Sequence, residues 1–357
     1  MSTAENLIHN GTNAPVPEQW ILPISTQAPI KGFHFYAFPM AILWDHPETH
    51  DWLFSNFLHL AFRKNYGSVP VPFAFYFDDY ASSPHLTTSK LSREVLRLTR
   101  IDGVQFVQNA LLQGHHVYLN LNEYFVPHKA AHQVRNNSHD SLVYGYQDGH
   151  FLLLGYDKTG RFRSTEIAFA DFAQAYDTLD QMPNPCEQVI LYKYNPHGTY
   201  ELDLHFLVDT LEDYLDSVNI SHKFTMLHNA WDRSYGFGSH ATLLEFIEKC
   251  LRGETYWDYR MVHTLYEHKN FMHLRLVHLH KKLGFAEFAT AAEPYQEMTR
   301  WAEMVRYIFL HWTKTEDRSN VHKMAELINK IADLEWKVLH QLLQALRVRS
   351  LKPVEVM

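Results

Sequence analysis

The sequence predicts an α+β fold, in which an N-terminal domain with an antiparallel sheet and an early buried helix is followed by an α-helical bundle domain. Short β-rich runs, several with alternating apolar residues, are confined to the first half. Beyond about residue 196 every long segment instead repeats apolar residues at the i, i+3, i+4 spacing of an amphipathic helix. We therefore expect an irregular segment at 1–22, an α+β domain at 23–196 and a helical domain at 197–357.

The N-terminal domain is expected to mix helices and strands. Phe35–Trp44 is strongly apolar and predicts a buried helix, with Pro39 in its first turn, where a missing N–H costs little. The other expected elements are a helix at Trp52–Phe62, a strand at Phe73–Phe77, a helical stretch at Ser89–Gln113 that Asp102-Gly103 breaks in two, a strand at His116–Leu121, a strand end plus helix at Thr165–Leu179 and a last strand at Gln188–Tyr194. In the helical domain, helices are expected at Leu202–Val218, His240–Arg252, Trp257–Leu283, Pro294–Lys314 and Asn320–Arg347.

Charge and composition narrow the classes of partner and location. The formal net charge is −8 and no basic run stands out, which argues against nucleic acid as a partner. The polar N-terminus has no apolar core of a signal peptide, and no stretch of about 18 apolar residues predicts a membrane span. We expect a cytoplasmic protein without a membrane partner. The long apolar C-terminal helix is compatible with a homodimer.

Metal and disulfide sites are not expected, although the chain has 25 histidines. Cys186 and Cys250 give neither a disulfide framework nor the spacing of a zinc site. The closest histidine pairs are His115-His116 and His278 with His280. The second of these pairs falls on a predicted helix. Residues two apart on a helix diverge, so that pair does not converge on one ion.

A β-hairpin is predicted at residues 139–157, "HDSLVYGYQDGHFLLLGYD", with Asp148-Gly149 as its turn. A two-residue loop pairs His139 with Lys158, whereas a three-residue loop pairs His139 with Asp157. We prefer the three-residue loop, because it places the glycine in the left-handed position. Directly opposed side chains then allow an imidazole–carboxylate hydrogen bond. The alternative is a pair that only closes the hairpin.

The stretch "LNEYFVPHKAAHQVRNNSHDSLVYGYQDGHFLLLGYD" carries a longer pattern, a Y-x-x-P segment, an H-x-x-x-x-Y-G-Y strand and then an aspartate. These elements are Tyr124 and Pro127, His139 with Tyr144-Gly145-Tyr146, and Asp157. Together with "YGFGSHATLLEFIEKC" and "LYEHKNFMHLRL" in the C-terminal half, the order of these pieces resembles the family of butirosin biosynthesis protein H over roughly residues 20–350. The resemblance implies a papain-like N-terminal domain and a helical C-terminal part.

The same resemblance implies acyl transfer. An acyl or aminoacyl group would pass from a thioester on an acyl or peptidyl carrier protein to a small amine, forming an amide bond in a natural-product pathway. Any phosphopantetheine would be carried by the partner protein, and the chain itself would hold no cofactor.

The expected nucleophile is missing. A papain-like enzyme carries a cysteine at the start of its early helix, where the thiolate is favoured. The corresponding window, "KGFHFYAFPMAIL", holds no cysteine, serine or threonine, and the cysteine position falls at or beside His34, between Phe33 and Phe35. Losing such a nucleophile costs on the order of 10⁴–10⁶ in rate, so a covalent acyl-enzyme is not expected.

Two functions remain open. In the first, His139, oriented by Asp157, is the general base of an amide-forming acyltransferase. In the second, the chain is a catalytically inactive papain-like relative that acts as a binding or scaffold protein in a biosynthetic cluster, and the histidine–aspartate pair is structural.

Further residues are candidates for substrate binding in the enzyme. They are His34, Phe33, Phe35, Asn120, Asn122, Glu123, Tyr124, His268 and Arg275. For the asparagines and the glutamate the structural alternative is hydrogen bonding to the backbone at a strand end. For His268 and Arg275, which are expected to receive an acidic group or phosphopantetheine, it is an ordinary polar helix face.

Overall fold

The computed structural model describes residues 17–76, 82–183, 186–223, 232–317 and 319–350. The fold is α+β, as predicted, and the chain divides into two compact units. The first contains residues 1–49 and 79–200, and the second contains residues 50–78 and 201–357. A single domain boundary near residue 197 therefore does not describe the division, because residues 50–78 of the N-terminal half belong to the helical unit.

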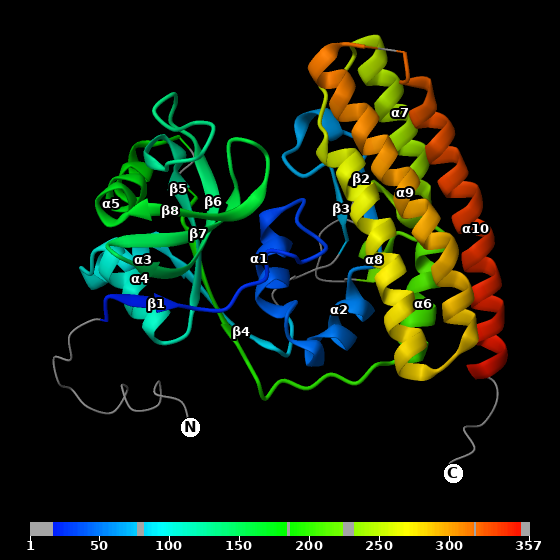
Figure 1. Cartoon of the computed structure of the whole chain (residues 1–357), viewed down its shortest axis with the longest axis horizontal. Helices are drawn as coiled ribbons and strands as arrows, with labels where there is room; N and C mark the ends of the chain where they lie inside the picture. The colour runs from blue at the N-terminus through cyan, green and yellow to red at the C-terminus, as the bar shows by residue number, and fades with distance from the viewer. Residues whose placement is uncertain (1–16, 77–81, 184–185, 224–231, 318, 351–357) are drawn as a thin grey trace. The chain divides into compact units, whose positions relative to one another are not determined.

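The first unit is built on a seven-stranded antiparallel sheet with the order β4-β9-β5-β6-β7-β8, and with β1 beside β6 (Figure 1). The strands are β1 (Gln19–Ile21), β4 (Leu86–Ser92), β5 (His116–Asn122), β6 (Ser138–Gln147), β7 (His150–Tyr156), β8 (Phe162–Ala168) and β9 (Gln188–Tyr194). Strand β1 lies in the segment expected to be irregular. It approaches so closely that a Cβ on Gly145 would lie 2.8 Å from the carbonyl oxygen of Trp20.

The predicted hairpin is present, but its turn differs from the preferred register. Gln147 faces His150 across a two-residue loop, in which Asp148 and Gly149 have φ values of 48° and 76°. Two positive φ values are the signature of a type I′ turn, whose twist matches that of the strands. A bulge between Val143 and Gly145 then shifts the pairing by one residue. The described β6–β7 ladder ends before it reaches His139.

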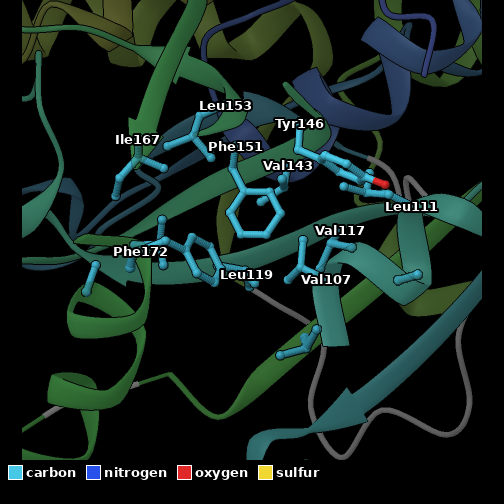
Figure 2. Packing of buried hydrophobic residues seen from close by; sticks show 14 of the residues in the cluster. Val107, Leu111, Val117, Leu119, Val143, Tyr146, Phe151, Leu153, Ile167 and Phe172 are labelled. Atoms are coloured by element: carbon cyan, nitrogen blue, oxygen red, sulfur yellow. The ribbon is translucent and has the colours of Figure 1, made fainter. Parts of the chain in front are cut away.

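Helices cover the sheet of the first unit on both faces. They are α1 (His34–Leu43), α3 (Arg93–Thr99), α4 (Gly103–Leu112) and α5 (Phe169–Asp177). Figure 2 shows the core between the sheet and helices α4 and α5, where Val117, Leu119 and Phe151 meet Leu111 and Phe172. Side chains alternate along a strand, so Tyr118 points to the opposite face.

Helix α1 lies on that opposite face. The ring centroids of Phe38 and Tyr118 are 5.1 Å apart, at an interplanar angle of 78°. Nine of the ten residues of α1 are buried, which confirms the early buried helix. Pro39 is the sixth residue of the helix rather than part of its first turn.

Two predicted helices of the N-terminal half are partly strands. Ser89–Gln113 begins as β4, because Leu86–Ser92 pairs with β9 along its whole length. Helix α3 follows with Ser92 as its N-cap, and α4 starts after Asp102, whose side chain accepts a hydrogen bond from the Gln105 amide. The predicted break at Asp102-Gly103 is confirmed.

The second unit combines the predicted helices with a small sheet of order β10-β2-β3 (Figure 1). Its elements are α2 (His50–Asn56), β2 (Leu60–Arg63), β3 (Phe73–Phe75), α6 (Leu204–Leu215), β10 (Arg233–Tyr235), α7 (Ser239–Arg252), α8 (Arg260–Leu283), α9 (Ala286–Thr315) and α10 (His322–Ser350). The helix expected at Trp52–Phe62 is thus α2 followed by β2. Helix α9 starts eight residues before the expected Pro294, which lies in its interior. No helix within the described ranges is long and apolar enough to cross a membrane.

Candidate active site

His139 is held by Glu123, not by Asp157. The Nδ1 atom of His139 lies 2.8 Å from Oε1 of Glu123. The glutamate side chain is 9% exposed and the histidine side chain 44% exposed, so a buried carboxylate anchors an accessible ring. With Nδ1–H donating to the carboxylate, the lone pair of Nε2 is available, and among the described residues no hydrogen bond engages it. We call this pair the His139–Glu123 dyad.

The sequence after β5 places Glu123 opposite His139. Asn122 is the last residue of β5, and its Oδ1 accepts hydrogen bonds from the backbone amides of Tyr124 and Asn137. The bond from Tyr124 stabilises the turn Glu123–Phe125, and the bond from Asn137 holds the residue just before β6 next to this turn. The side-chain Nδ2 of Asn137 also donates to Oε2 of Glu123, at 2.7 Å, so both carboxylate oxygens have a donor.

His34 lies beside the dyad. It is the first residue of α1, and its ring centroid is 5.1 Å from that of His139. The ring stacks on Phe38 at 4.7 Å and on Tyr156 at 5.6 Å. The residue expected at the cysteine position therefore lies next to the candidate base, but it is an imidazole packed among aromatic rings and only 6% exposed.

Further charged groups surround His34 below the surface. Its Nδ1 atom is 3.9 Å from Oδ2 of Asp140, which accepts a hydrogen bond from the hydroxyl of Tyr118. The ammonium of Lys129 donates to the carbonyl of Tyr156 at 2.8 Å and lies 3.7 Å from Glu123. Sequence reasoning missed Tyr118, Lys129 and Asp140, because isolated residues in a strand and a loop carry no pattern.

Burial decides the charge of these groups. Desolvation holds the pKa of His34 well below its ordinary value, and the nearby His139 and Lys129 lower that pKa further. Burial also raises the pKa of Asp140 and lowers the pKa of Lys129. For Glu123, burial opposes ionisation, but the hydrogen bond and charge of His139 outweigh it and leave the pKa lowered. His34 is thus neutral at pH 7, and Glu123 is ionised.

Asp157 is engaged elsewhere. Its Oδ1 accepts hydrogen bonds from the amides of Thr159 and Arg161, and its Oδ2 lies 2.5 Å from Nε of Arg163. These partners close the β7–β8 turn and lower the pKa of Asp157, against the cost of burial. The predicted His139–Asp157 pair is wrong, because the register extrapolated from the hairpin turn ignored both the end of the ladder and the local turn that captures the aspartate.

His268 and Arg275 belong to the core of the second unit. Both side chains are fully buried. Nε2 of His268 lies 2.9 Å from the carbonyl oxygen of Leu58, while the guanidinium of Arg275 donates to the carbonyls of Phe54 and Phe57. The prediction that these residues face a cleft and receive a substrate is wrong. Their periodic spacing on α8 marks the inner face of the helix.

The remaining predicted residues divide between the site and its support. Phe33 is the N-cap residue of α1, and its ring contacts that of Phe35 at 5.6 Å. Asn120 donates to the hydroxyl of Ser138, and Asn122 has the structural role described above. Tyr124 packs its ring against Phe125, at 5.0 Å. Of all the residues predicted to bind substrate, His34 and Glu123 are the two that the structure places next to His139, the candidate base.

No group of three or more metal-ligating side chains converges anywhere in the described part of the chain. The geometry of the His139–Glu123 dyad supports proton transfer by a half-exposed imidazole with a fixed tautomer.

Comparison with protein-family models and with curated proteins gave no match to this chain.

Proposed function

We propose that the chain is an amide-forming acyltransferase, in which His139 is the general base and Glu123 is its positioning residue. The observation that supports this proposal is the 2.8 Å contact between His139 Nδ1 and a buried carboxylate, which leaves Nε2 accessible beside the start of α1. The proposed substrates, an acyl thioester on a carrier protein and a small amine, are those that the resemblance to the butirosin biosynthesis protein H family implies.

The proposed reaction needs no covalent intermediate on the protein. The amine nitrogen attacks the thioester carbonyl as Nε2 of His139 takes the amine proton, so a C–N bond forms. The C–S bond then breaks, and the imidazolium returns the proton to the leaving thiolate. General-base catalysis supplies roughly 10²–10⁴ in rate, and holding both substrates together supplies effective molarities of about 10⁵ M or more. These terms suffice for an activated thioester.

The decisive experiment compares His139→Ala with wild type. The protein is incubated with acyl-pantetheine thioesters and a panel of primary amines, and amide product is measured by mass spectrometry. We expect product from wild type and a loss of about 10²-fold or more in the variant. His150→Ala is the matched control, since His150 begins the other strand of the same hairpin and its ring bonds to the Asp148 carbonyl rather than to a carboxylate. Equal yields from wild type and His139→Ala exclude the proposed base.

A scaffold function is the second candidate, and the packing of His34 favours it. The ring occupies the position expected for the nucleophile, is almost fully buried and stacks on Phe38 and Tyr156. In that function the dyad stabilises the sheet, since a hydrogen bond to a charged group contributes about 1.5–3 kcal/mol. Wild type without activity on any thioester, but with saturable binding to a carrier protein or to a catalytically intact relative, supports the scaffold.

A further inference from the structure

A pocket of about 460 Å³ opens in the helical unit, where helices α7 and α9 both end. It is separate from the dyad, which belongs to the other unit. Leu251 of α7 and Thr313 of α9 line it, together with Trp257, Trp312 and Glu316. The volume lies within the range of about 300–1,000 Å³ that small-molecule sites occupy.

Two helix C-termini give the pocket a negative potential. The last carbonyls of a helix lack intrahelical donors and carry the negative end of its dipole. At the end of α7 the Gly253 amide donates to Cys250, and at the end of α9 the Glu316 amide donates to Trp312. The carbonyls of Leu251 and Thr313 accept no hydrogen bond among the described residues.

Aromatic faces and a carboxylate add to this potential. The indole planes of Trp257 and Trp312 are nearly perpendicular, at 81°, and Trp257 also contacts Phe309. Indole is the best cation–π acceptor among the side chains. The exposed Glu316 caps α9 with φ of 58°, and no ion pair engages its carboxylate within the described ranges.

The other lining groups do not offset this negative character. Arg252 is the basic residue that lines the pocket, and its guanidinium is held by Glu254 at 2.6 Å and lies 3.8 Å from Glu248. Burial raises the pKa of the Cys250 thiol to about 12, so the thiol stays protonated and neutral.

We infer that this pocket binds a small organic ammonium ion, with the half-buried indole of Trp257, which packs against Trp312, facing its alkyl groups and Glu316 as its counter-charge. A metal ion fits poorly, because the aromatic carbons contribute no ligands. An anion is disfavoured by both helix ends. The ligand class is therefore a methylated or primary alkylammonium compound.

The test is isothermal titration calorimetry of the full chain with choline, with tetramethylammonium and with the neutral choline analogue 3,3-dimethylbutan-1-ol. We expect saturable binding of both cations and binding of the neutral analogue at least tenfold weaker, because the analogue has the shape but not the charge. Glu316→Gln should weaken choline binding about fivefold, and Glu316→Lys should abolish it. Glu297→Gln, an exposed acid elsewhere on α9, is the matched control and should leave the affinity unchanged.

Two outcomes overturn the inference. Equal affinity for choline and its neutral analogue means that the pocket recognises apolar shape alone. Absence of saturable binding by either cation means that no ammonium site exists. Trp312→Phe retains an aromatic ring and is expected to weaken binding less than Trp312→Leu, which should cost about tenfold. Because the Glu316 variants change an exposed residue, they remain informative if a tryptophan variant fails to fold.

Discussion

Replacing Glu123 by glutamine removes one negative charge from beneath His139 while keeping the size of the side chain. The wild-type bond joins Nδ1 of His139 to a carboxylate that is 9% exposed, at 2.8 Å. A hydrogen bond to a charged group contributes about 1.5–3 kcal/mol, and a neutral one about 0.5–1.5 kcal/mol. The difference of about 1–1.5 kcal/mol corresponds to roughly tenfold in rate, because the imidazolium formed during catalysis loses its counter-charge.

The assay for Glu123→Gln is kcat/KM for amide formation, with circular dichroism to establish that the variant is folded. We expect a loss of about tenfold, smaller than the loss for His139→Ala. Unchanged kcat/KM in a folded Glu123→Gln protein refutes the role of the carboxylate, and unchanged activity in both variants refutes the dyad as a whole.

The same substitution has a signature in stability. The pKa of Glu123 is lower in the folded state than in the unfolded chain. Its carboxylate therefore stabilises the fold above the unfolded pKa of about 4.3, and this contribution is lost as the pH falls through the folded pKa. Glu123→Gln also leaves the buried ammonium of Lys129 without the carboxylate that lies 3.7 Å away. The melting temperature should fall at pH 7, and the difference from wild type should shrink below about pH 4.

Three further substitutions test other parts of the structure. Gly145→Ala should cost about 1–3 kcal/mol in denaturant unfolding, because its Cβ would meet the β1 backbone at 2.8 Å; stability equal to wild type would show that β1 is not seated there. Lys269→Met should cost about 3–5 kcal/mol in denaturant unfolding, because the fully buried carboxylate of Glu335, bonded to Lys269 at 2.6 Å, would lose its ammonium partner and keep the hydroxyls of Tyr214 and Tyr295. A large recovery is expected when Glu335→Leu is added. Asp157→Asn should lower stability above about pH 4 but leave the kcat/KM of folded protein within about twofold, whereas a loss like that of His139→Ala would restore Asp157 as its partner.

Local chemistry in the sequence predicted much of the first unit. Asp148-Gly149 specified a turn, Asp102-Gly103 specified a break between two helices, and the strands expected at His116–Leu121 and Gln188–Tyr194 have limits that agree with the structure to within one residue. Residues 89–92 of the helical stretch expected at Ser89–Gln113 are strand instead, because β4 owes its conformation to β9, about 100 residues away in sequence. Such non-local pairing overrides local helical spacing.

The candidate site was predicted in part. His34 and His139 were singled out from the order of motifs, and the structure places their rings 5.1 Å apart. The orienting carboxylate was assigned to Asp157, since a hairpin register is the simplest way to bring an acid to that histidine. The described β6–β7 ladder ends before His139, the turn after β7 engages Asp157, and the side-chain bonds of Asn122 bring Glu123 to the histidine instead. None of these features can be read from composition or spacing.

The path of the chain through two units has a consequence for synthesis. Residues 50–78 carry Trp52, Phe57, Phe62 and Phe73, which are buried against elements made after residue 200. During translation these aromatic side chains emerge well before the helices that cover them. Until those helices are made, the side chains stay exposed to solvent and are prone to aggregation. A polypeptide ended near residue 200 should therefore precipitate or recruit chaperones, even though the seven strands of its sheet are all present.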